Sequence, residues 1–133
     1  MPPQPDSPGA LVVATADEAE WMSLLPLLSG SHAPKRAVTI EDCARHIARG
    51  VVSVILADRE LPDGTWRDLL NLAQSTTPSP RVVVLDRDAD DSRWLDVLDA
   101  GAFDLLPSPV DASLLRRAIE GAERQWRTAG AAA

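Results

Sequence analysis

Short apolar runs rich in valine and isoleucine recur along the chain and end at polar or turn-forming residues. The clearest are ALVVA at 10–14, VVSVILA at 51–57 and RVVVL at 81–85. Runs this short and this rich in β-branched residues are typical of strands buried on both faces of a sheet. The stretch at 35–40 is more polar and predicts an edge strand, and FDLL at 103–106 predicts a fifth strand.

The segments between these runs have the apolar spacing and the end signals of helices. The predicted helices are one capped by Thr15 or Asp17 that runs to about Ser29, then 41–49, 65–74, 91–100, and a last one capped by Asp111. Pro26 inside the first helix predicts a kink or an early end. The first helix includes the apolar residues Met22, Leu25 and Leu28. We expect Leu95 and Leu98 to face inward in the fourth helix, and the apolar stripe of the last helix is Leu114, Leu115, Ala118, Ile119 and Ala122.

Strand and helix alternate five times, which is the pattern of an α/β domain. Consecutive parallel strands need crossover helices, and these cover both faces of the sheet. The alternation therefore predicts a single doubly wound, five-stranded parallel sheet flanked by five helices. We place this domain at 10–127, with a disordered Pro-rich lead-in at 1–9 (MPPQPDSPG) and a disordered tail at 128–133 (TAGAAA).

Charge and cysteine content narrow the classes of partner and compartment. The net charge of −7 argues against a nucleic-acid-binding surface. The single cysteine, Cys43, fits a reducing cytoplasm. No apolar run approaches the roughly 20 residues of a membrane helix, so we expect neither a membrane span nor a membrane partner.

A carboxylate ends two of the buried runs. Asp58 follows VVSVILA and precedes Leu61-Pro62-Asp63-Gly64, which is turn chemistry, and Asp86 ends the run at 81–85. Open α/β sheets bind ligands at the carboxyl ends of their strands, so we expect Asp58 and Asp86 to lie close together in one crevice. The structural alternatives are that Asp58 only accepts backbone hydrogen bonds in its turn and that Asp86 only caps the next loop.

The segment from Asp58 through Leu61-Pro62 to Gly64 resembles the phosphoacceptor segment of response-regulator receiver domains. Residues 100–106, followed by Pro109 and Asp111, resemble the end of the family's fourth helix, its fifth strand and the start of its fifth helix. The resemblance covers about 10–124. It implies the flavodoxin-like receiver fold, Asp58 as the phosphoacceptor and a cis peptide bond before Pro109.

Most other positions that the family uses for chemistry differ here. Receivers carry an acidic pair that holds Mg²⁺ where this chain has Ala14 and Thr15. They carry Thr or Ser where this chain has Asp86, and Lys where it has Ser108. They often carry an aromatic switch residue where this chain has Leu105. The resemblance therefore marks the chain as an atypical, degenerate member.

The physics of these changes disfavours phosphoryl transfer. That reaction depends on cations that neutralise the developing charge, and both the Lys and the usual Mg²⁺ ligands are missing. A second carboxylate ~4 Å from Asp58 would add a repulsion of about 4 kcal/mol at an effective dielectric constant of roughly 20. We therefore predict a receiver that acts through protein–protein contact, with little or no phosphorylation and no resident cofactor.

Two other hypotheses stay open. In the first, the chain accepts phosphate on Asp58 from a histidine kinase, and a rearranged Mg²⁺ site is built from Asp17, Glu18, Asp58 and Asp86. In the second, Asp58 and Asp86 act as the acid and base of an enzyme. No substrate pocket or nucleophile is visible in the sequence, so we expect no enzyme.

The expected partner is a histidine kinase or a downstream signalling protein. Receivers commonly form homodimers through the face built from their fourth helix, fifth strand and fifth helix. Trp94 and Leu105 would make that face more apolar here and are the candidate interaction residues. The alternative for Trp94 is that it folds down against its own helix.

Overall fold

The computed structural model describes residues 9–28 and 33–132, and its centre is a five-stranded parallel sheet. The strands are β1 (Ala10–Ala14), β2 (Lys35–Ala37), β3 (Val52–Asp58), β6 (Arg81–Asp86) and β7 (Asp104–Pro107). Their order in the sheet is β2-β1-β3-β6-β7, with every neighbouring pair parallel. The predicted five-stranded parallel sheet is confirmed.

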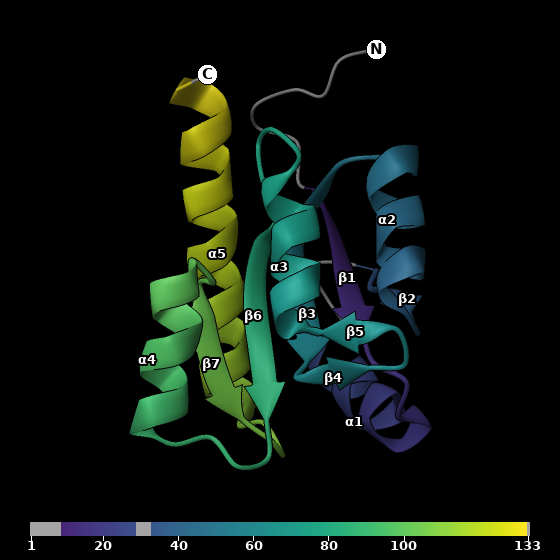
Figure 1. Cartoon of the computed structure of the whole chain (residues 1–133), viewed down its shortest axis with the longest axis vertical. Coiled ribbons are helices and arrows are strands. Elements are labelled where there is room, and N and C mark those ends of the chain that lie inside the picture. The colour runs from purple at the N-terminus through teal and green to yellow at the C-terminus, as the bar shows by residue number, and fades with distance from the viewer. Residues whose placement is uncertain (1–8, 29–32, 133) are drawn as a thin grey trace.

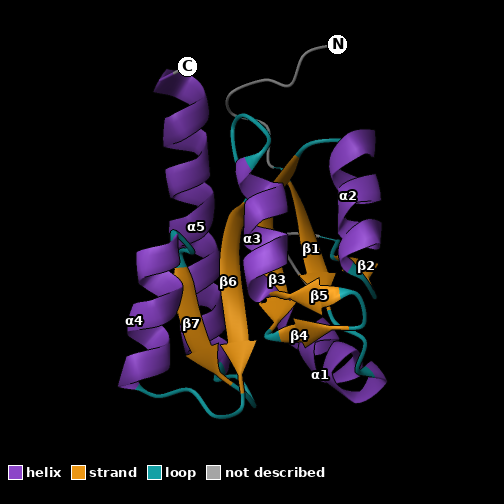
Figure 2. Ribbon diagram, viewed as in Figure 1, coloured by secondary structure: helices purple, strands orange, loops and turns teal. Residues whose placement is uncertain are grey.

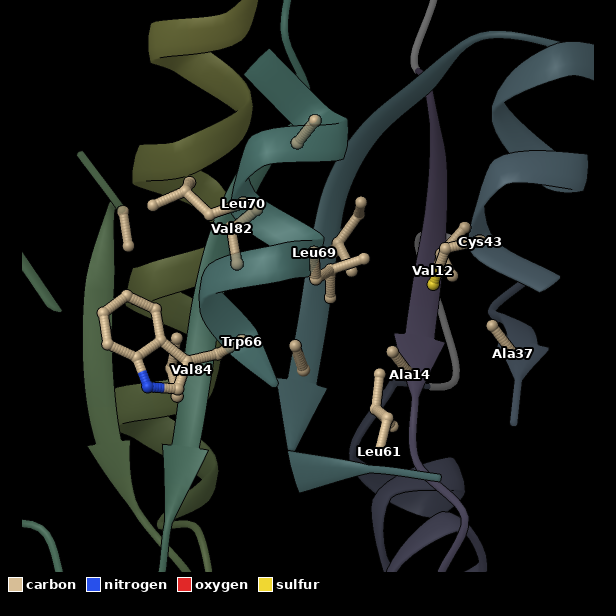
Figure 3. Close-up of a cluster of buried hydrophobic side chains, with 14 of the residues drawn as sticks. Val12, Ala14, Ala37, Cys43, Leu61, Trp66, Leu69, Leu70, Val82 and Val84 are labelled. Carbon is tan, nitrogen blue, oxygen red and sulfur yellow. The ribbon is translucent and has the colours of Figure 1, made fainter. Parts of the chain in front are cut away.

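Helices cover both faces of this sheet (Figures 1 and 2). They are α1 (Glu18–Leu28), α2 (Ile40–Arg49), α3 (Trp66–Gln74), α4 (Asp91–Ala100) and α5 (Ala112–Ala132). One buried cluster joins the sheet to residues of α2, α3 and α4, among them Cys43, Leu69 and Val97 (Figure 3). The other joins it to α1 and α5 through Leu24 and Leu115. The sheet is therefore doubly wound, as predicted.

The central strand β3 shows why its sequence is a continuous apolar run. Ile55 and Ala57 belong to the cluster under α2, α3 and α4, whereas Val54 and Leu56 belong to the cluster under α1 and α5. Because both faces are covered, the buried positions of β3 are apolar except for Ser53, whose hydroxyl donates to the Ala10 carbonyl at 3.4 Å. The strand reaches the solvent only at Asp58, which is half-buried.

The turn expected after Asp58 is a small antiparallel hairpin of β4 (Glu60–Leu61) and β5 (Gly64–Thr65). Asp63 at its tip accepts hydrogen bonds from the backbone N–H groups of Ile40 (2.8 Å) and Glu41 (3.1 Å). These are unpaired donors in the first turn of α2. The hairpin therefore caps a neighbouring helix and holds the chain after Asp58 in place.

The domain bounds predicted from the sequence need correction at both ends. Helix α5 continues through Ala132, so residues 128–132 are helical and not a disordered tail. Alanine is the best helix former, and the Thr128 hydroxyl donates to the Arg124 carbonyl at 2.9 Å. Gly9 is buried against Ser53, so the ordered domain begins one residue earlier than predicted. Residues 1–8 and 133 lie outside the described part of the chain.

Leu95, predicted to face inward, is 52% exposed, and Leu114 of the predicted apolar stripe is 43% exposed. In α4 the fully buried residue is instead Val97, at 3%. A helix rotates as a unit to fit its neighbours, so the tertiary contacts and not the local leucine spacing decide which stripe is buried. Within the described residues, no helix combines the length and apolarity needed to cross a membrane.

Candidate functional site

An open pocket of about 430 Å³ lies at the carboxyl ends of β1, β3 and β6. Most of its lining is polar or charged: Asp17, Glu20, Asp58, Arg59, Asp86, Arg87 and Ser108. Asp58 and Asp86 both line it, so the expectation that they share one crevice is confirmed. The crevice sits where open α/β sheets bind their ligands.

Asp58 is held by Thr15, which stands at the position where receivers carry an acid. The Thr15 hydroxyl donates to Asp58 Oδ2 at 2.5 Å and lies 3.1 Å from Glu20 Oε2. The same hydroxyl oxygen accepts the Asp17 N–H at 3.0 Å. Thr15 is only 1% exposed, so it is a fixed hydrogen-bonding hub between β1, β3 and α1.

The surroundings of Asp58 favour its neutral form. Burial raises the pKa of Asp58 to about 8, and a hydrogen bond with Glu20 and the negative charges of Glu20 and Asp17 act in the same direction. The hydrogen bond from Thr15 opposes this rise. At neutral pH the Asp58 carboxyl is therefore mostly protonated, and a protonated carboxyl is a poor nucleophile.

Glu20 is the residue of this pocket that the sequence reasoning missed. Asp17 caps α1 by accepting hydrogen bonds from Ala19 N–H (2.9 Å) and Glu20 N–H (3.3 Å). In this Asp-x-x-Glu pattern, Glu20 falls at the third position of the helix, where an acid normally bonds back to the capping residue. Here its carboxylate instead lies near Thr15 and accepts a hydrogen bond from Ser108 Oγ at 3.3 Å.

The main partner of Asp86 is Arg93, which the sequence analysis did not predict. Arg93 Nη1 donates to both of its carboxylate oxygens, at 3.1 and 3.0 Å, and Arg59 lies 3.9 Å away. Asp86 also accepts the Asp88 N–H at 2.9 Å, so the loop-capping alternative is part of its role. Because Asp86 is 6% exposed and paired, its charge is largely neutralised. We expected Asp86 to repel negative charge on Asp58, and this expectation needs correction. The negative charges that raise the pKa of Asp58 are those of Glu20 and Asp17.

Of the four residues of the rearranged metal site, Asp17, Asp58 and Asp86 line the same pocket, and Glu18 does not. Glu18 pairs with Arg36, and Asp17 pairs with Arg87 at 3.0 Å while capping α1. Among the described residues, no group of three or more His, Cys, Asp or Glu side chains is arranged to hold a metal ion.

The two candidate interaction residues differ in exposure. Leu105 is 5% exposed and belongs to the core cluster beneath α4. Strand β7 lies between α4 and α5, which cover its side chains at this point. Leu105 therefore cannot be a surface contact. Trp94 is 43% exposed, as predicted, and its indole N–H donates to Asp104 Oδ1 at 3.1 Å. Trp94 thus presents its ring to solvent while its polar edge is tied to β7.

Ser108 and Ala14 complete the positions that the resemblance singled out. Ser108 precedes a cis bond to Pro109, as the resemblance implied, and its hydroxyl faces Glu20. Ala14 is fully buried in the core. Neither places a cation or an anionic oxygen in the pocket, and the basic residues that line it, among those that the structure describes, are Arg59 and Arg87.

No protein-family model matches the chain. Among curated proteins, it is 30% identical over 110 residues to the response regulator protein PilR of Pseudomonas aeruginosa. The match covers 81% of this chain and 25% of PilR, so the chain spans about a quarter of that relative's length.

Solved structures with the same fold include three receiver-type domains at 20–21% identity. A putative response regulator from Chloroflexus aurantiacus gives a TM-score of 0.79, with 89% of this chain and 99% of that chain covered. The signal receiver domain of an HD domain-containing protein from Pseudomonas fluorescens gives 0.81, with 91% and 90% covered. The beryllofluoride-activated receiver domain dimer of NtrC4 gives 0.79, with 88% and 98% covered.

Proposed function

The chain is a receiver domain of the response-regulator type, and we propose that it is an atypical one that signals by protein–protein contact with little or no phosphorylation of Asp58. The observation that carries the proposal is the environment of Asp58. Its pKa is raised to about 8, and two carboxylates, Glu20 and Asp17, repel additional negative charge. A phosphoacceptor needs the opposite environment, in which the carboxylate is ionised and cations surround it.

The cations that do line the pocket are already engaged. Of the two arginines that line it, Arg59 lies 3.9 Å from Asp86 and Arg87 is paired with Asp17 at 3.0 Å. Ser108 stands where receivers carry a lysine, and its hydroxyl bonds Glu20. A phosphoryl group on Asp58 would therefore meet an acidic pocket whose positive charges are neutralised by other carboxylates. We propose accordingly that the domain has no enzymatic activity and needs no resident cofactor.

The proposed output is a contact surface on α4, β7 and α5. Trp94 (43% exposed) and Leu95 (52%) on α4, with Leu114 (43%) on α5, are exposed apolar side chains on the two helices that pack against β7. Clusters of exposed apolar side chains mark protein interaction sites. We propose that this face binds a histidine kinase, a downstream signalling protein or a second copy of the chain, in the cytoplasm.

The test is an amide NMR titration with Mg²⁺ and then with Mg²⁺ plus beryllofluoride, a mimic of the acyl phosphate. We expect no saturable shifts at Thr15, Asp58 or Leu105. The Ser108→Lys variant is the matched control, because it restores the missing cation and should gain affinity for beryllofluoride. Saturable shifts in the unmodified protein would overturn the proposal.

A second candidate is a working phosphoreceiver, and one observation favours it. Arg59 and Arg87 are 45% and 74% exposed at the pocket, so either guanidinium group is free to turn toward a phosphoryl group. In that case Mg²⁺ would be required, and Asp58 would be phosphorylated by a histidine kinase. The same titration distinguishes the two candidates, because only the second predicts saturable, Mg²⁺-dependent binding of beryllofluoride.

A further inference from the structure

A small cleft of about 90 Å³ lies between α3 and α4, two helices on the same face of the sheet (Figure 1). Three arginines line it: Arg59, Arg67 and Arg93. Its volume is far below the roughly 300–1,000 Å³ of a drug-sized ligand site, so the cleft has room for one small group. A larger pocket of about 260 Å³, at the opposite end of the sheet against Trp126, is lined mainly by apolar atoms, and Arg127 is the only charged residue among its described lining residues.

Most of the hydrogen-bond donors of the three arginines are unused. Arg59 Nε lies 3.9 Å from Asp86 Oδ2, which is beyond hydrogen-bond distance. The Arg67 side chain forms no hydrogen bond or ion pair within the described part of the chain. Arg93 donates to Asp86 through Nη1 alone, which leaves its Nε and Nη2 groups without a partner there. The cleft is therefore rich in N–H groups that have no acceptor of their own.

Trp66 holds two of these arginines in position. The Arg67 guanidinium carbon lies 4.5 Å from the centroid of the Trp66 ring, which is a cation–π contact. Trp66 is 7% exposed, and Figure 3 shows its ring near Val84 of β6. The Trp66 backbone N–H donates to the Arg59 carbonyl at 3.0 Å, across the β4–β5 hairpin. An arginine that is already stacked loses little conformational freedom when it binds an anion.

The charges that line the cleft sum to a positive value. Three guanidinium groups and two carboxylates leave one net positive charge there, in a chain whose net charge is −7. Of the two acids, Asp86 is 6% exposed and bonded to Arg93, whereas Asp96 is exposed and has no hydrogen bond or ion pair with the described residues. The charges of Asp88 and Asp90 also act on Arg93, but neither residue lines the cleft.

These donors fit a tetrahedral anion. A planar carboxylate is satisfied by two parallel N–H groups of one arginine, whereas a phosphate group presents oxygens in several directions and accepts from several guanidinium groups at once. Clusters of arginines are a recurring means of binding phosphorylated groups. Here the guanidinium groups come from three separate places in the fold: the residue after β3, the first turn of α3 and the first turn of α4.

We propose that the cleft between α3 and α4 binds one phosphate group, either as inorganic phosphate or as the phosphate ester of a small molecule. Its oxygens accept from Arg59, Arg67 and the unused N–H groups of Arg93. The group is bound without covalent chemistry and away from Asp58, so the proposal does not depend on whether Asp58 is phosphorylated. Because Arg59 and Asp86 line both the cleft and the crevice at Asp58, a bound phosphate group acts on both sites.

NMR titrations of the full chain at constant ionic strength test the proposal. The probes are inorganic phosphate, phenyl phosphate and phenylacetate, which carries a carboxylate in place of the phosphate. The signals to follow are the Nε–Hε groups of Arg59 and Arg67 and the indole N–H of Trp66. We expect saturable shifts with a millimolar Kd for the two phosphates and much weaker binding of phenylacetate. Tighter binding of phenyl phosphate would identify an ester as the ligand, and tighter binding of inorganic phosphate would identify the free ion.

Three variants locate the site. Arg67→Met should weaken phosphate binding by about fivefold or more, because a hydrogen bond between two charged groups is lost. Arg87→Met is the matched control: Arg87 lines the crevice at Asp58 and not the cleft, so the Kd should change by less than about twofold. Asp96→Asn should tighten binding, because it removes the unpaired negative charge of the cleft. The unfolding midpoint of each variant shows whether the fold is intact.

Three results would overturn the proposal. The first is the absence of saturable shifts at Trp66, Arg59 and Arg67 with phosphate at tens of millimolar. The second is an equal loss of affinity in Arg87→Met and Arg67→Met, which would place the anion in the crevice at Asp58. The third is binding of phenylacetate as tight as that of phenyl phosphate, because the arginines would then attract any anion.

Discussion

At the residue scale, the protonation of Asp58 decides what the pocket can do. A carboxyl group that is buried beside Glu20 is uncharged over most of the physiological range, and the Thr15 hydrogen bond only partly offsets this. Receivers use an ionised aspartate at this place as the nucleophile. Asp58 is the one position that matches the receivers, yet the residues around it keep its carboxyl protonated instead of ionised.

Replacing Glu20 by Gln should lower the pKa of Asp58 from about 8 toward its ordinary value, because one negative charge and one acidic hydrogen-bond partner are removed. A pH titration of the Asp58 carboxyl carbon by NMR measures this directly. Glu18→Gln is the matched control, since Glu18 pairs with Arg36 and should leave the titration unchanged. An unchanged titration in Glu20→Gln would show that burial alone controls Asp58.

The raised pKa also predicts how stability depends on pH. In the unfolded chain Asp58 ionises near pH 4, and in the folded chain only near pH 8, so the folded state binds more protons between these values. The contribution of Asp58 to stability is therefore fully present below pH 4 and is lost as the pH rises to 8. Asp58→Asn removes this dependence, so its stability relative to the unmodified protein should rise between pH 5 and pH 8. Urea unfolding of both proteins at pH 5 and pH 8 checks the expectation; equal differences at the two pH values would contradict it.

At the element scale, two polar contacts hold α4 and α2 to the rest of the site. Arg93 joins α4 to Asp86 at the end of β6, and Asp63 joins the hairpin after Asp58 to the first turn of α2. Both contacts link an element that carries a pocket residue to a helix on the surface. They limit how far α4 and the hairpin can move independently of the sheet.

Arg93→Met should destabilise the fold, because it leaves the buried carboxylate of Asp86 without its main partner. Adding Asp86→Asn should recover much of the loss, since the unpaired charge is then gone. Arg45→Met is the control: its ion pairs with Glu41 and Asp42 are exposed, and its loss should change the unfolding free energy by less than about 1 kcal/mol.

Asp63→Ala should destabilise the protein through loss of the cap on α2. The effect should be local, with faster hydrogen exchange at the Ile40 and Glu41 amides and little change in α5. If exchange at these two amides stayed the same, the contact would contribute nothing in solution.

At the scale of the whole molecule, the two ends of the sheet differ chemically, and helices α4 and α5 expose apolar side chains. The end of the sheet at Asp58 is acidic and polar, and the opposite end carries the apolar pocket at Trp126. Trp94 and Leu95 on α4 and Leu114 on α5 are exposed. A module of this shape can contact partners through these helices without chemistry at Asp58.

If these helices form a homodimer, Leu95→Asp should convert the dimer to a monomer without loss of fold, because Leu95 is 52% exposed. Sedimentation equilibrium measures the oligomeric state, and the unfolding midpoint reports whether the fold is intact. Met22→Asp is the control, since Met22 is equally exposed on α1. A monomer in the unmodified protein up to millimolar concentration would leave these helices to a different protein partner.

The amino-acid sequence by itself determined the alternation of elements, the five-stranded parallel sheet and the position of Asp58 at the end of β3, because these depend on local composition and on the period of apolar residues. Only the tertiary structure decided which carboxylates act on Asp58. Thr15 bonds Asp58 across 43 residues and Ser108 bonds Glu20 across 88, and no local pattern encodes contacts at such separations. The same holds for the burial of Leu105 and the exposure of Leu95, since a residue's environment depends on what packs against its element.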